Sequence, residues 1–122
     1  MKVMIVEDVD AMSELLAHVI GEIPGLAVSG KARNGAEARL ELLRRRPDFV
    51  LLDEILPGEA SLDLIREFGL HEVPVVLITS LSEERALPAG VLGRILKPAW
   101  DSVDQDRARI QSEIFSLLTL RP

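Results

Sequence analysis

The sequence predicts an α/β fold in which helices cover both faces of a parallel sheet. Short apolar runs alternate along the chain with segments whose apolar residues recur at helical spacing. Polar residues follow the apolar runs, as expected where buried parallel strands end at one edge of an open sheet. We therefore expect a (βα)5 arrangement, a doubly wound sheet of five parallel strands, in a single domain that spans residues 1–122.

The first half of the chain supplies three of the expected strands and two of the helices. The strands are predicted at Lys2–Glu7, Leu26–Lys31 and Asp48–Asp53. The helices are predicted at Asp10–Glu22 and Ala36–Arg46. The residues expected to cap the first helix are Asp8 or Asp10, and the turn into the second is Asn34-Gly35. The side chains expected to face inward from the second helix are Ala38, Leu42 and Leu43.

The second half of the chain continues the alternation. A helix is predicted at Ser61–Gly69, a strand at Pro74–Thr79, a strand at Val91–Leu96 and a last helix at Val103–Leu120. Between the two strands we expect a brief helix that starts near Ser82, because acidic residues follow it, as they do in the first turn of many helices. Pro88 and Gly90 would end that helix almost at once.

Composition excludes several functional classes. Of 122 residues, 48% are hydrophobic but only 3% aromatic, which predicts an aliphatic core. The chain has no cysteine, so thiolate metal sites, disulfides and thiol redox chemistry are excluded. A net charge of −6 disfavours a nucleic-acid surface, which needs a basic stripe. No apolar stretch approaches the ~18 residues that span a bilayer, so we expect a cytoplasmic protein without direct contacts to nucleic acid or membrane.

The polar residues at the strand ends form the candidate site. Three carboxylates, one hydroxyl and one ammonium are expected to meet at the carboxyl edge of the sheet; they belong to Glu7, Asp8, Asp53, Thr79 and Lys97. Carboxylates brought so close repel one another unless a cation joins them. Mg²⁺ suits such a cluster because it prefers hard oxygen ligands. The pattern indicates a divalent cation and a phosphoryl group at one site.

These residues resemble the receiver domain of two-component response regulators, and the resemblance covers essentially the whole chain. Its marks are Glu7-Asp8, Asp53 in the run Leu-Leu-Asp-Glu-Ile-Leu-Pro-Gly, Thr79-Ser80 and Lys97-Pro98. Pro24-Gly25-Leu26, Asn34-Gly35 and residues 79–84 are similar to the receiver of chemotaxis methylesterases. The resemblance implies a flavodoxin-like fold. It leaves open whether the chain is a stand-alone regulator or the N-terminal part of a longer protein.

The resemblance also implies a role for each site residue. Asp53 would be the phosphoacceptor, with Lys97 and Thr79 contacting the phosphoryl oxygens. Asp8 and Asp53 would bind Mg²⁺ directly, Glu7 through water, and Ile55 through its backbone carbonyl. The Lys97-Pro98 bond is expected to be cis, as in the family, and the nearby Trp100 is expected to pack under the active-site loop.

The resemblance implies a signalling switch rather than an enzyme, with Mg²⁺-dependent self-phosphorylation from a phosphodonor. The phosphoryl source would be a histidine kinase or a phosphotransfer protein, and the output a downstream protein target or a fused output domain. We expect slow autodephosphorylation because Ile55 and Leu81, which flank the path of attacking water in the family, are apolar and cannot activate a water.

The chain departs from the family pattern beside strand Val91–Leu96. Arg94 occupies the position of the usual aromatic switch residue, and we expect it to swing between solvent and an acidic partner such as Glu83 or Glu84. Only 17 residues lie between Thr79 and Lys97, about one helical turn fewer than is usual in the family. These departures keep open a second hypothesis, a receiver fold that acts as a phosphorylation-independent adaptor for protein–protein interaction. A phosphohydrolase is disfavoured because no second aspartate follows Asp53 two residues on.

Overall fold

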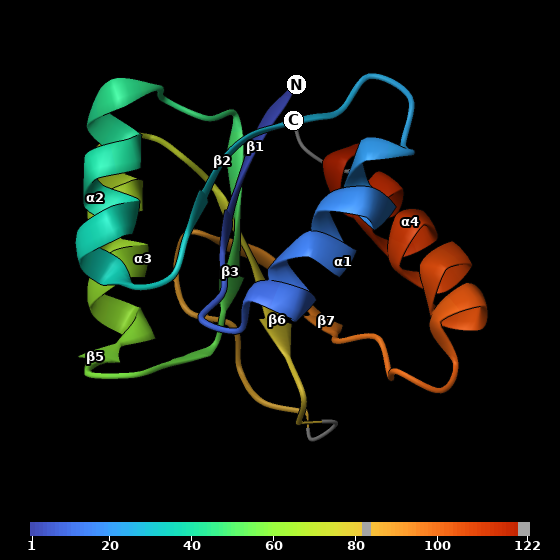
Figure 1. Cartoon of the computed structure of the whole chain (residues 1–122). Coiled ribbons are helices and arrows are strands. Elements are labelled where there is room, and N and C mark those ends of the chain that lie inside the picture. The colour runs from blue at the N-terminus through green and yellow to red at the C-terminus, as the bar shows by residue number, and fades with distance from the viewer. Residues whose placement is uncertain (82–83, 120–122) are drawn as a thin grey trace.

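A five-stranded parallel sheet forms the centre of the computed structural model, which describes residues 1–81 and 84–119. The strand order is β2-β1-β3-β6-β7 (Figure 1). The strands are β1 (Lys2–Val6), β2 (Ala27–Ala32), β3 (Phe49–Asp53), β6 (Val75–Thr79) and β7 (Val91–Leu96). This order confirms the predicted doubly wound sheet. It also reverses direction between β1 and β3, and such a switch point opens the crevice where ligands bind in α/β sheets.

Two helices cover each face of the sheet (Figure 1). The helices α1 (Asp10–Gly21) and α4 (Val103–Thr119) lie on one face. The helices α2 (Gly35–Arg44) and α3 (Ser61–Leu70) lie on the other. The predicted end of the last helix, Leu120, lies outside the described residues. None of the helices within residues 1–81 and 84–119 is long and apolar enough to cross a membrane.

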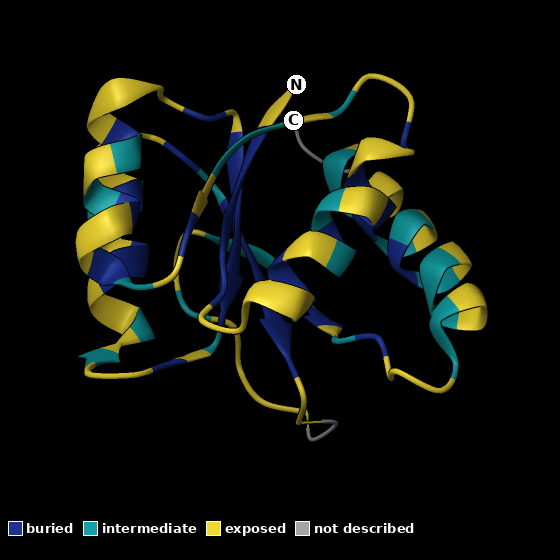
Figure 2. Cartoon of the chain, in the orientation of Figure 1, coloured by how far each residue is buried: buried dark blue, intermediate teal, exposed yellow. Residues whose placement is uncertain are grey.

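The central strands are buried on both sides, and alternate residues join different cores (Figure 2). In β1, Val3 and Ile5 pack into the core beneath α1 and α4. Met4 and Val6 pack into the core beneath α2 and α3. This is why the strands appear in the sequence as continuous apolar runs rather than as alternating patterns.

The two N-terminal helices begin differently. At α2, Asn34 Oδ1 accepts a hydrogen bond from Glu37 N at 2.9 Å, so the predicted turn is an N-cap. At α1 the prediction of a cap by Asp8 or Asp10 is wrong: Val9 stands at the N-cap position and makes no side-chain bond. Both aspartates are engaged elsewhere, since Asp8 lies in a carboxylate cluster and Asp10 pairs with Arg33 at 3.0 Å.

The inward face of α2 is narrower than predicted. Ala38 and Leu42 are buried, but Leu43 is 75% exposed. One residue advances a helix by about 100°, so a side chain next to Leu42 turns away from the sheet. Leu43 was therefore wrongly assigned to the core.

No brief helix precedes β7 in the part of that segment that the structure describes. Residues 84–90 contain no helical turn, while Ser82 and Glu83 lie outside the described residues. Pro88 cannot donate a backbone hydrogen bond and disfavours helical backbone at Leu87. Gly90 has a φ of 88°, which glycine adopts without steric cost. The predicted helix is thus wrong over residues 84–87, the described part of it before Pro88.

A short hairpin that the sequence analysis missed directly follows the Asp53 strand. The strands β4 (Ile55–Leu56) and β5 (Glu59–Ala60) pair antiparallel around Gly58, whose φ is 75°. Arg39 of α2 forms ion pairs with Glu59 of the hairpin and with Glu67 of α3. These ion pairs connect the hairpin to both helices of its face and fix the chain immediately after Asp53.

Candidate functional site

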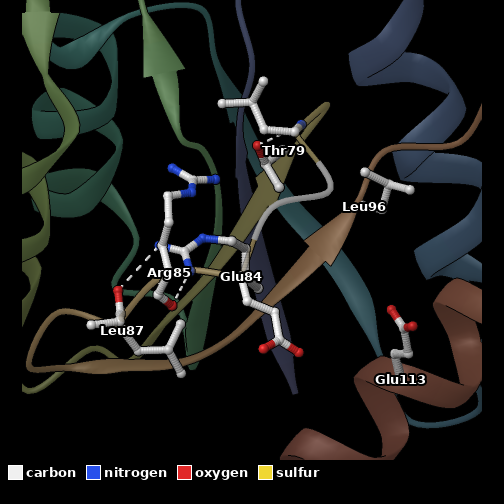
Figure 3. Close-up of a pocket in the computed structure, with 9 residues that line it drawn as sticks. Thr79, Glu84, Arg85, Leu87, Leu96 and Glu113 are labelled. Atoms are coloured by element: carbon white, nitrogen blue, oxygen red, sulfur yellow. Dashed lines mark hydrogen bonds between the residues drawn. The ribbon is translucent and has the colours of Figure 1, made fainter.

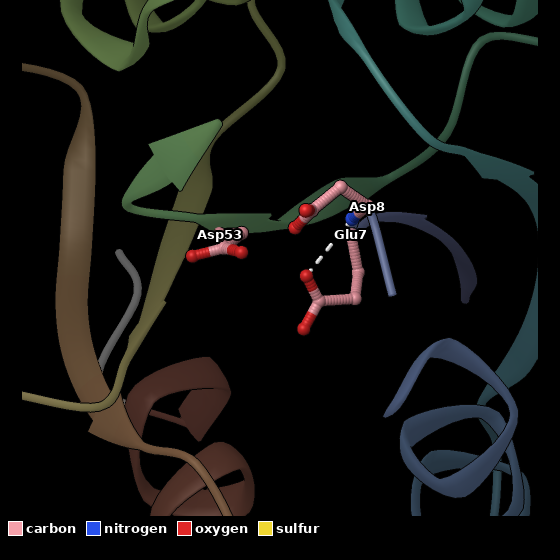
Figure 4. Close-up of side chains that lie close together, drawn as sticks. All are labelled: Glu7, Asp8 and Asp53. Atoms are coloured by element: carbon pink, nitrogen blue, oxygen red, sulfur yellow. Dashed lines mark hydrogen bonds between the residues drawn. The ribbon is translucent and has the colours of Figure 1, made fainter. Parts of the chain in front are cut away.

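Three carboxylates meet at the switch point of the sheet. Glu7 and Asp8 follow β1, and Asp53 ends β3, the strand that pairs with β1 in parallel. One ligand oxygen from each of the three side chains lies within 4.8 Å of the others. Figure 4 shows the carboxylates of Asp8 and Asp53 turned towards a common space, with the Glu7 carboxylate beside it. The predicted acidic cluster is therefore assembled as the sequence indicated.

Lys97 reaches this cluster from the end of β7. Its Nζ lies 2.9 Å from Glu7 Oε1 and 3.0 Å from Asp53 Oδ2. One ammonium among three carboxylates leaves a surplus of two negative charges when all four groups are ionised. This surplus matches the charge of a divalent cation.

Backbone hydrogen bonds fix the orientation of the two buried carboxylates. Asp8 N donates to Glu7 Oε2 at 2.9 Å, and Ile55 N donates to Asp53 Oδ1 at 3.1 Å. The other Asp53 oxygen faces Lys97. Asp53 is thus held from both sides, by the first residue of the β4–β5 hairpin and by Lys97.

The electrostatics of Glu7 depend on its burial. Desolvation raises the pKa of Glu7 to about 7, with a further contribution from Asp53 that Lys97 opposes. Burial alone would lower the pKa of Lys97, but the attraction of Glu7 and Asp53 outweighs it and the pKa lies above its usual value. Glu7 Oε1 faces Lys97 and yet has no hydrogen bond of acceptable geometry among the described residues. A buried oxygen in this state is suited to accept a cation or a cation-bound water.

The donor set fits Mg²⁺. Its described side-chain donors, Glu7, Asp8 and Asp53, are all carboxylates, the hard oxygen ligands that Mg²⁺ selects. Asp8 is exposed while Glu7 and Asp53 are buried, so one side of the cluster remains open to water molecules that Mg²⁺ retains.

Thr79 lies beside the cluster, at the end of β6. It is buried, and its Oγ1 accepts a hydrogen bond from Leu81 N at 3.0 Å. Its carbonyl accepts one from Lys97 N at 2.7 Å. This bond connects the ends of β6 and β7, so a displacement of the Thr79 backbone would also displace the backbone of Lys97.

Two expectations at the C-terminal side of Lys97 are wrong. The described peptide bonds are all trans, including Lys97-Pro98. Lys97 contacts both carboxylates from this isomer, which X–Pro bonds favour by ~0.5–1 kcal/mol. Trp100 does not pack under the active-site loop, because 60% of it is exposed.

Arg94 has a different partner from the expected one. Its guanidinium lies 2.9 Å from Glu54 Oε2, and the same carboxylate also pairs with Arg85 at 2.8 Å. The proposed alternative, Glu84, instead lines an open groove near Thr79, together with Leu87, Leu96 and Glu113 (Figure 3). Glu83 lies outside the described residues. Sequence analysis missed Glu54 and Arg85, although a charged residue directly after Asp53 was a visible signal.

Sequence comparison identifies the same family. The family model described as the response regulator receiver domain matches residues 3–108. Protein-glutamate methylesterase/protein-glutamine glutaminase 1 of Syntrophus aciditrophicus is 36% identical over 118 residues, 88% of this chain and 33% of that protein. The corresponding protein of Pyrococcus horikoshii is 34% identical over 122 residues, 94% of this chain and 33% of that protein. The chain thus spans about one third of the length of these relatives.

Solved structures show the same fold. The response regulator domain of Thermotoga maritima CheB has a TM-score of 0.82 at 22% identity, covering 100% of this chain and 98% of that chain. A chain in the structure of the CheA3 P1 domain in complex with CheY6 from R. sphaeroides has a TM-score of 0.73 at 25% identity, covering 94% of this chain and 96% of that chain. The fold, the order of the site residues and the family model agree. This chain belongs to the response regulator receiver domain family, whose general role is phosphorylation-dependent switching in two-component signalling.

Proposed function

We propose that Asp53 is the phosphoacceptor of this receiver domain and that residues 1–122 act as one switch unit. The observation that carries this proposal is the position of Asp53. Its carboxylate belongs to the cluster with Glu7 and Asp8, with one oxygen held by Ile55 N and the other 3.0 Å from Lys97 Nζ. A carboxylate oriented in this way is suited to nucleophilic attack on phosphorus.

The transfer step uses residues of this chain in distinct roles. An Asp53 oxygen forms a bond to phosphorus while the bond from phosphorus to the donor breaks, and its electron pair leaves with the donor atom. With a histidine kinase or phosphotransfer protein as donor, that atom is an imidazole nitrogen. Lys97 stabilises the negative charge that the phosphoryl oxygens carry during transfer.

Mg²⁺ would be held by Asp8 and Asp53 directly, by Glu7 through water and by the Ile55 carbonyl. When bound, the ion supplies positive charge to the phosphoryl oxygens. Glu7 and Asp8 contribute two of the three carboxylates of the cluster. Because Asp8 is exposed, its side of the cluster remains accessible to a phosphodonor.

The switch itself involves Thr79. Phosphorylation adds about 1.5 to 2 negative charges and strong acceptor oxygens at Asp53. Thr79 would then donate its hydroxyl hydrogen to a phosphoryl oxygen. Because the Thr79 carbonyl is bonded to Lys97 N, movement of Thr79 is transmitted to the end of β7.

The phosphoryl group is expected to be long-lived. Ile55 and Leu81 are both exposed and apolar, so neither can orient a water for attack. We expect Ile55→Asn to shorten the lifetime of the phosphoryl group without changing its site of attachment. Unchanged, rapid hydrolysis in both proteins would contradict this view.

The output would be a protein target or a fused output domain. The methylesterase relatives are about three times as long as this chain, so most of their length lies outside the matched region. Their activity is therefore not assigned to this chain.

A second candidate function is a phosphorylation-independent adaptor. It is favoured by Arg94, which occupies the switch position in an ion pair with Glu54 and not as a mobile aromatic residue. Both functions use the same fold, and they differ in whether Asp53 accepts phosphate.

Acetyl phosphate separates the two candidates. The wild-type chain and an Asp53→Asn variant are incubated with acetyl phosphate, with and without Mg²⁺, and their intact masses are recorded. We expect one added phosphoryl group in the wild type with Mg²⁺ and none in the variant or without the ion. A folded wild-type chain that gains no phosphoryl group would favour the adaptor.

A further inference from the structure

Glu54 lies next to the proposed phosphoacceptor, and its carboxylate is mostly buried. Its backbone N donates to Ile78 O at 2.9 Å, which fixes it where β3 and β6 end. Its side chain is only 12% exposed. A carboxylate with so little access to water requires partners of opposite charge.

Two arginines provide that charge from different parts of the chain. The Arg85 Nη atoms contact both Glu54 oxygens, at 2.8 and 2.9 Å. Arg94 of β7 contacts Oε2 through Nη2 at 2.9 Å and through Nε at 3.2 Å. We call these three residues, Glu54, Arg85 and Arg94, the latch.

The latch also holds the backbone of the segment that lacks a helix. Arg94 donates to Arg85 O at 2.9 Å and to Ala86 O at 3.4 Å. Residues 84–87 line the groove near Thr79, so these bonds set the position of one of its walls (Figure 3). One mostly buried guanidinium, that of Arg94, therefore connects the residue after Asp53, the strand β7 and the groove wall.

We propose that the latch is the element through which phosphorylation of Asp53 repositions residues 84–87. This inference rests on the proposed function, because it requires a phosphoryl group at Asp53. The new negative charge would appear at the residue adjacent to Glu54, where it repels the Glu54 carboxylate and attracts the guanidinium groups. The planar fork of arginine binds phosphate as well as it binds carboxylate, so the pairing can be exchanged.

Arg85 is the residue of the latch that moves. Its side chain is 34% exposed, whereas that of Arg94 is 13% exposed and makes two further bonds to backbone carbonyls. The Arg85 guanidinium can separate from Glu54 because water can still hydrate the arginine charge. The Arg94 guanidinium has too little contact with water to do so. Loss of the bidentate Arg85 contact would leave the Arg94 bonds as the remaining contacts of the latch to this segment, so the groove wall could shift.

A purely structural ion cluster makes a different prediction. It would stabilise residues 84–87 equally whether or not Asp53 is phosphorylated. The distinguishing observation is a response of these residues to phosphorylation that depends on the Glu54 charge.

The backbone amide NMR signals of residues 84–87 test the proposal on the full chain. Wild type, Glu54→Gln and Arg85→Ala are compared with and without acetyl phosphate and Mg²⁺, and the intact mass of each sample gives its phosphorylation level. Asp63→Asn is the matched control, because Asp63 also faces an arginine, Arg66, but lies exposed on α3. Arg85→Ala removes a partly exposed side chain and leaves Glu54 with Arg94.

Phosphorylation of wild type and of Asp63→Asn is expected to shift the amide signals of residues 84–87. In Glu54→Gln and Arg85→Ala these signals are expected to differ from those of wild type before phosphorylation and to change little afterwards. A phosphorylated wild type with unchanged signals, or a Glu54→Gln response equal to that of wild type, would overturn the latch. If the wild type gained no phosphoryl group, the proposed function would be overturned. The proposed role of the latch would then fail as well, because it requires a phosphoryl group at Asp53.

Discussion

The carboxyl edge of the sheet has two unlike halves. The acidic half, at the ends of β1 and β3, holds Glu7, Asp8 and Asp53 in the order that marks the family. The arginine half, at the ends of β6 and β7, carries Arg94 at the switch position and a non-helical segment at residues 84–90. Lys97 directly follows β7 but joins the acidic half through its side chain. The difference teaches that one edge of the sheet can hold a cluster with surplus negative charge beside a cluster with surplus positive charge, Glu54 with two arginines.

The largest effect is expected from removal of the ammonium that faces Asp53. Lys97→Met retains an unbranched side chain but removes the charge that stabilises the transferred group. We expect phosphorylation by acetyl phosphate to slow by about 100-fold. The rate is measured by intact mass over time.

Lys31→Met is the control for this variant, because Lys31 is an exposed residue of β2. It should react as fast as wild type. If Lys97→Met kept the wild-type rate, Lys97 would have no role in phosphoryl transfer. The transfer would then depend on the other residues of the acidic half.

The arginine half is tested by a double-mutant cycle. Glu54→Gln, Arg94→Gln and the double variant are unfolded in urea, and the coupling free energy is extracted. We expect about 1–2 kcal/mol, because the side chains are 12% and 13% exposed and therefore poorly screened.

A solvent-exposed pair provides the reference. Asp63 and Arg66 of α3 lie 3.9 Å apart, with side chains 60% and 75% exposed, and we expect a coupling below about 0.5 kcal/mol. Equal coupling in the two pairs would remove the distinction between the arginine half and ordinary surface charge.

The acidic half should give the protein a pH-dependent stability. The pKa of Glu7 is raised in the folded state to about 7 from an ordinary value of 4.5. The folded protein thus holds a proton that the unfolded chain releases, so the Glu7 contribution to stability is present below pH 4.5 and lost as pH rises through about 7. Urea unfolding across this range should show the loss.

Two changes should remove this dependence. Glu7→Gln eliminates the titrating group, and saturating Mg²⁺ favours the ionised carboxylate and so adds stability at the higher pH. A wild-type profile that is equally steep with Mg²⁺ would mean that the ion does not bind near Glu7.

The smallest effect concerns the cap of α2. Asn34→Ala removes the oxygen that accepts from Glu37 N and should lower the free energy of unfolding by about 1 kcal/mol. Val9→Ala is the control, because Val9 occupies the N-cap position of α1 without a side-chain bond. Equal losses in the two variants would show that the Asn34 bond contributes nothing beyond helix propensity.

The acidic half could be predicted from the sequence because its residues stand directly at the ends of buried strands. A parallel sheet brings such positions together without further information. This is why the sequence indicates Glu7, Asp53 and Lys97, and why it predicts each bound of the five strands to within one residue.

The arginine half could not be predicted because its contacts are pairings of distant side chains. Arg94 and Glu54 are 40 residues apart, and no periodicity connects them. The β4–β5 hairpin has two-residue strands, too short to show alternation, although Pro57-Gly58 marks its turn. The absent helix at residues 84–90 shows that Pro88 outweighs acidic residues that favour a helix start.

Backbone amide NMR of the whole chain tests the central claim most directly, that Asp53 phosphorylation is transmitted across the edge of the sheet. Mg²⁺ is added first and acetyl phosphate second. We predict that Mg²⁺ shifts the amides of Glu7, Asp8 and Ile55, and that phosphorylation then shifts Thr79, Lys97 and residues 84–87. Phosphorylation of Asp53 with shifts confined to the acidic half would contradict the account.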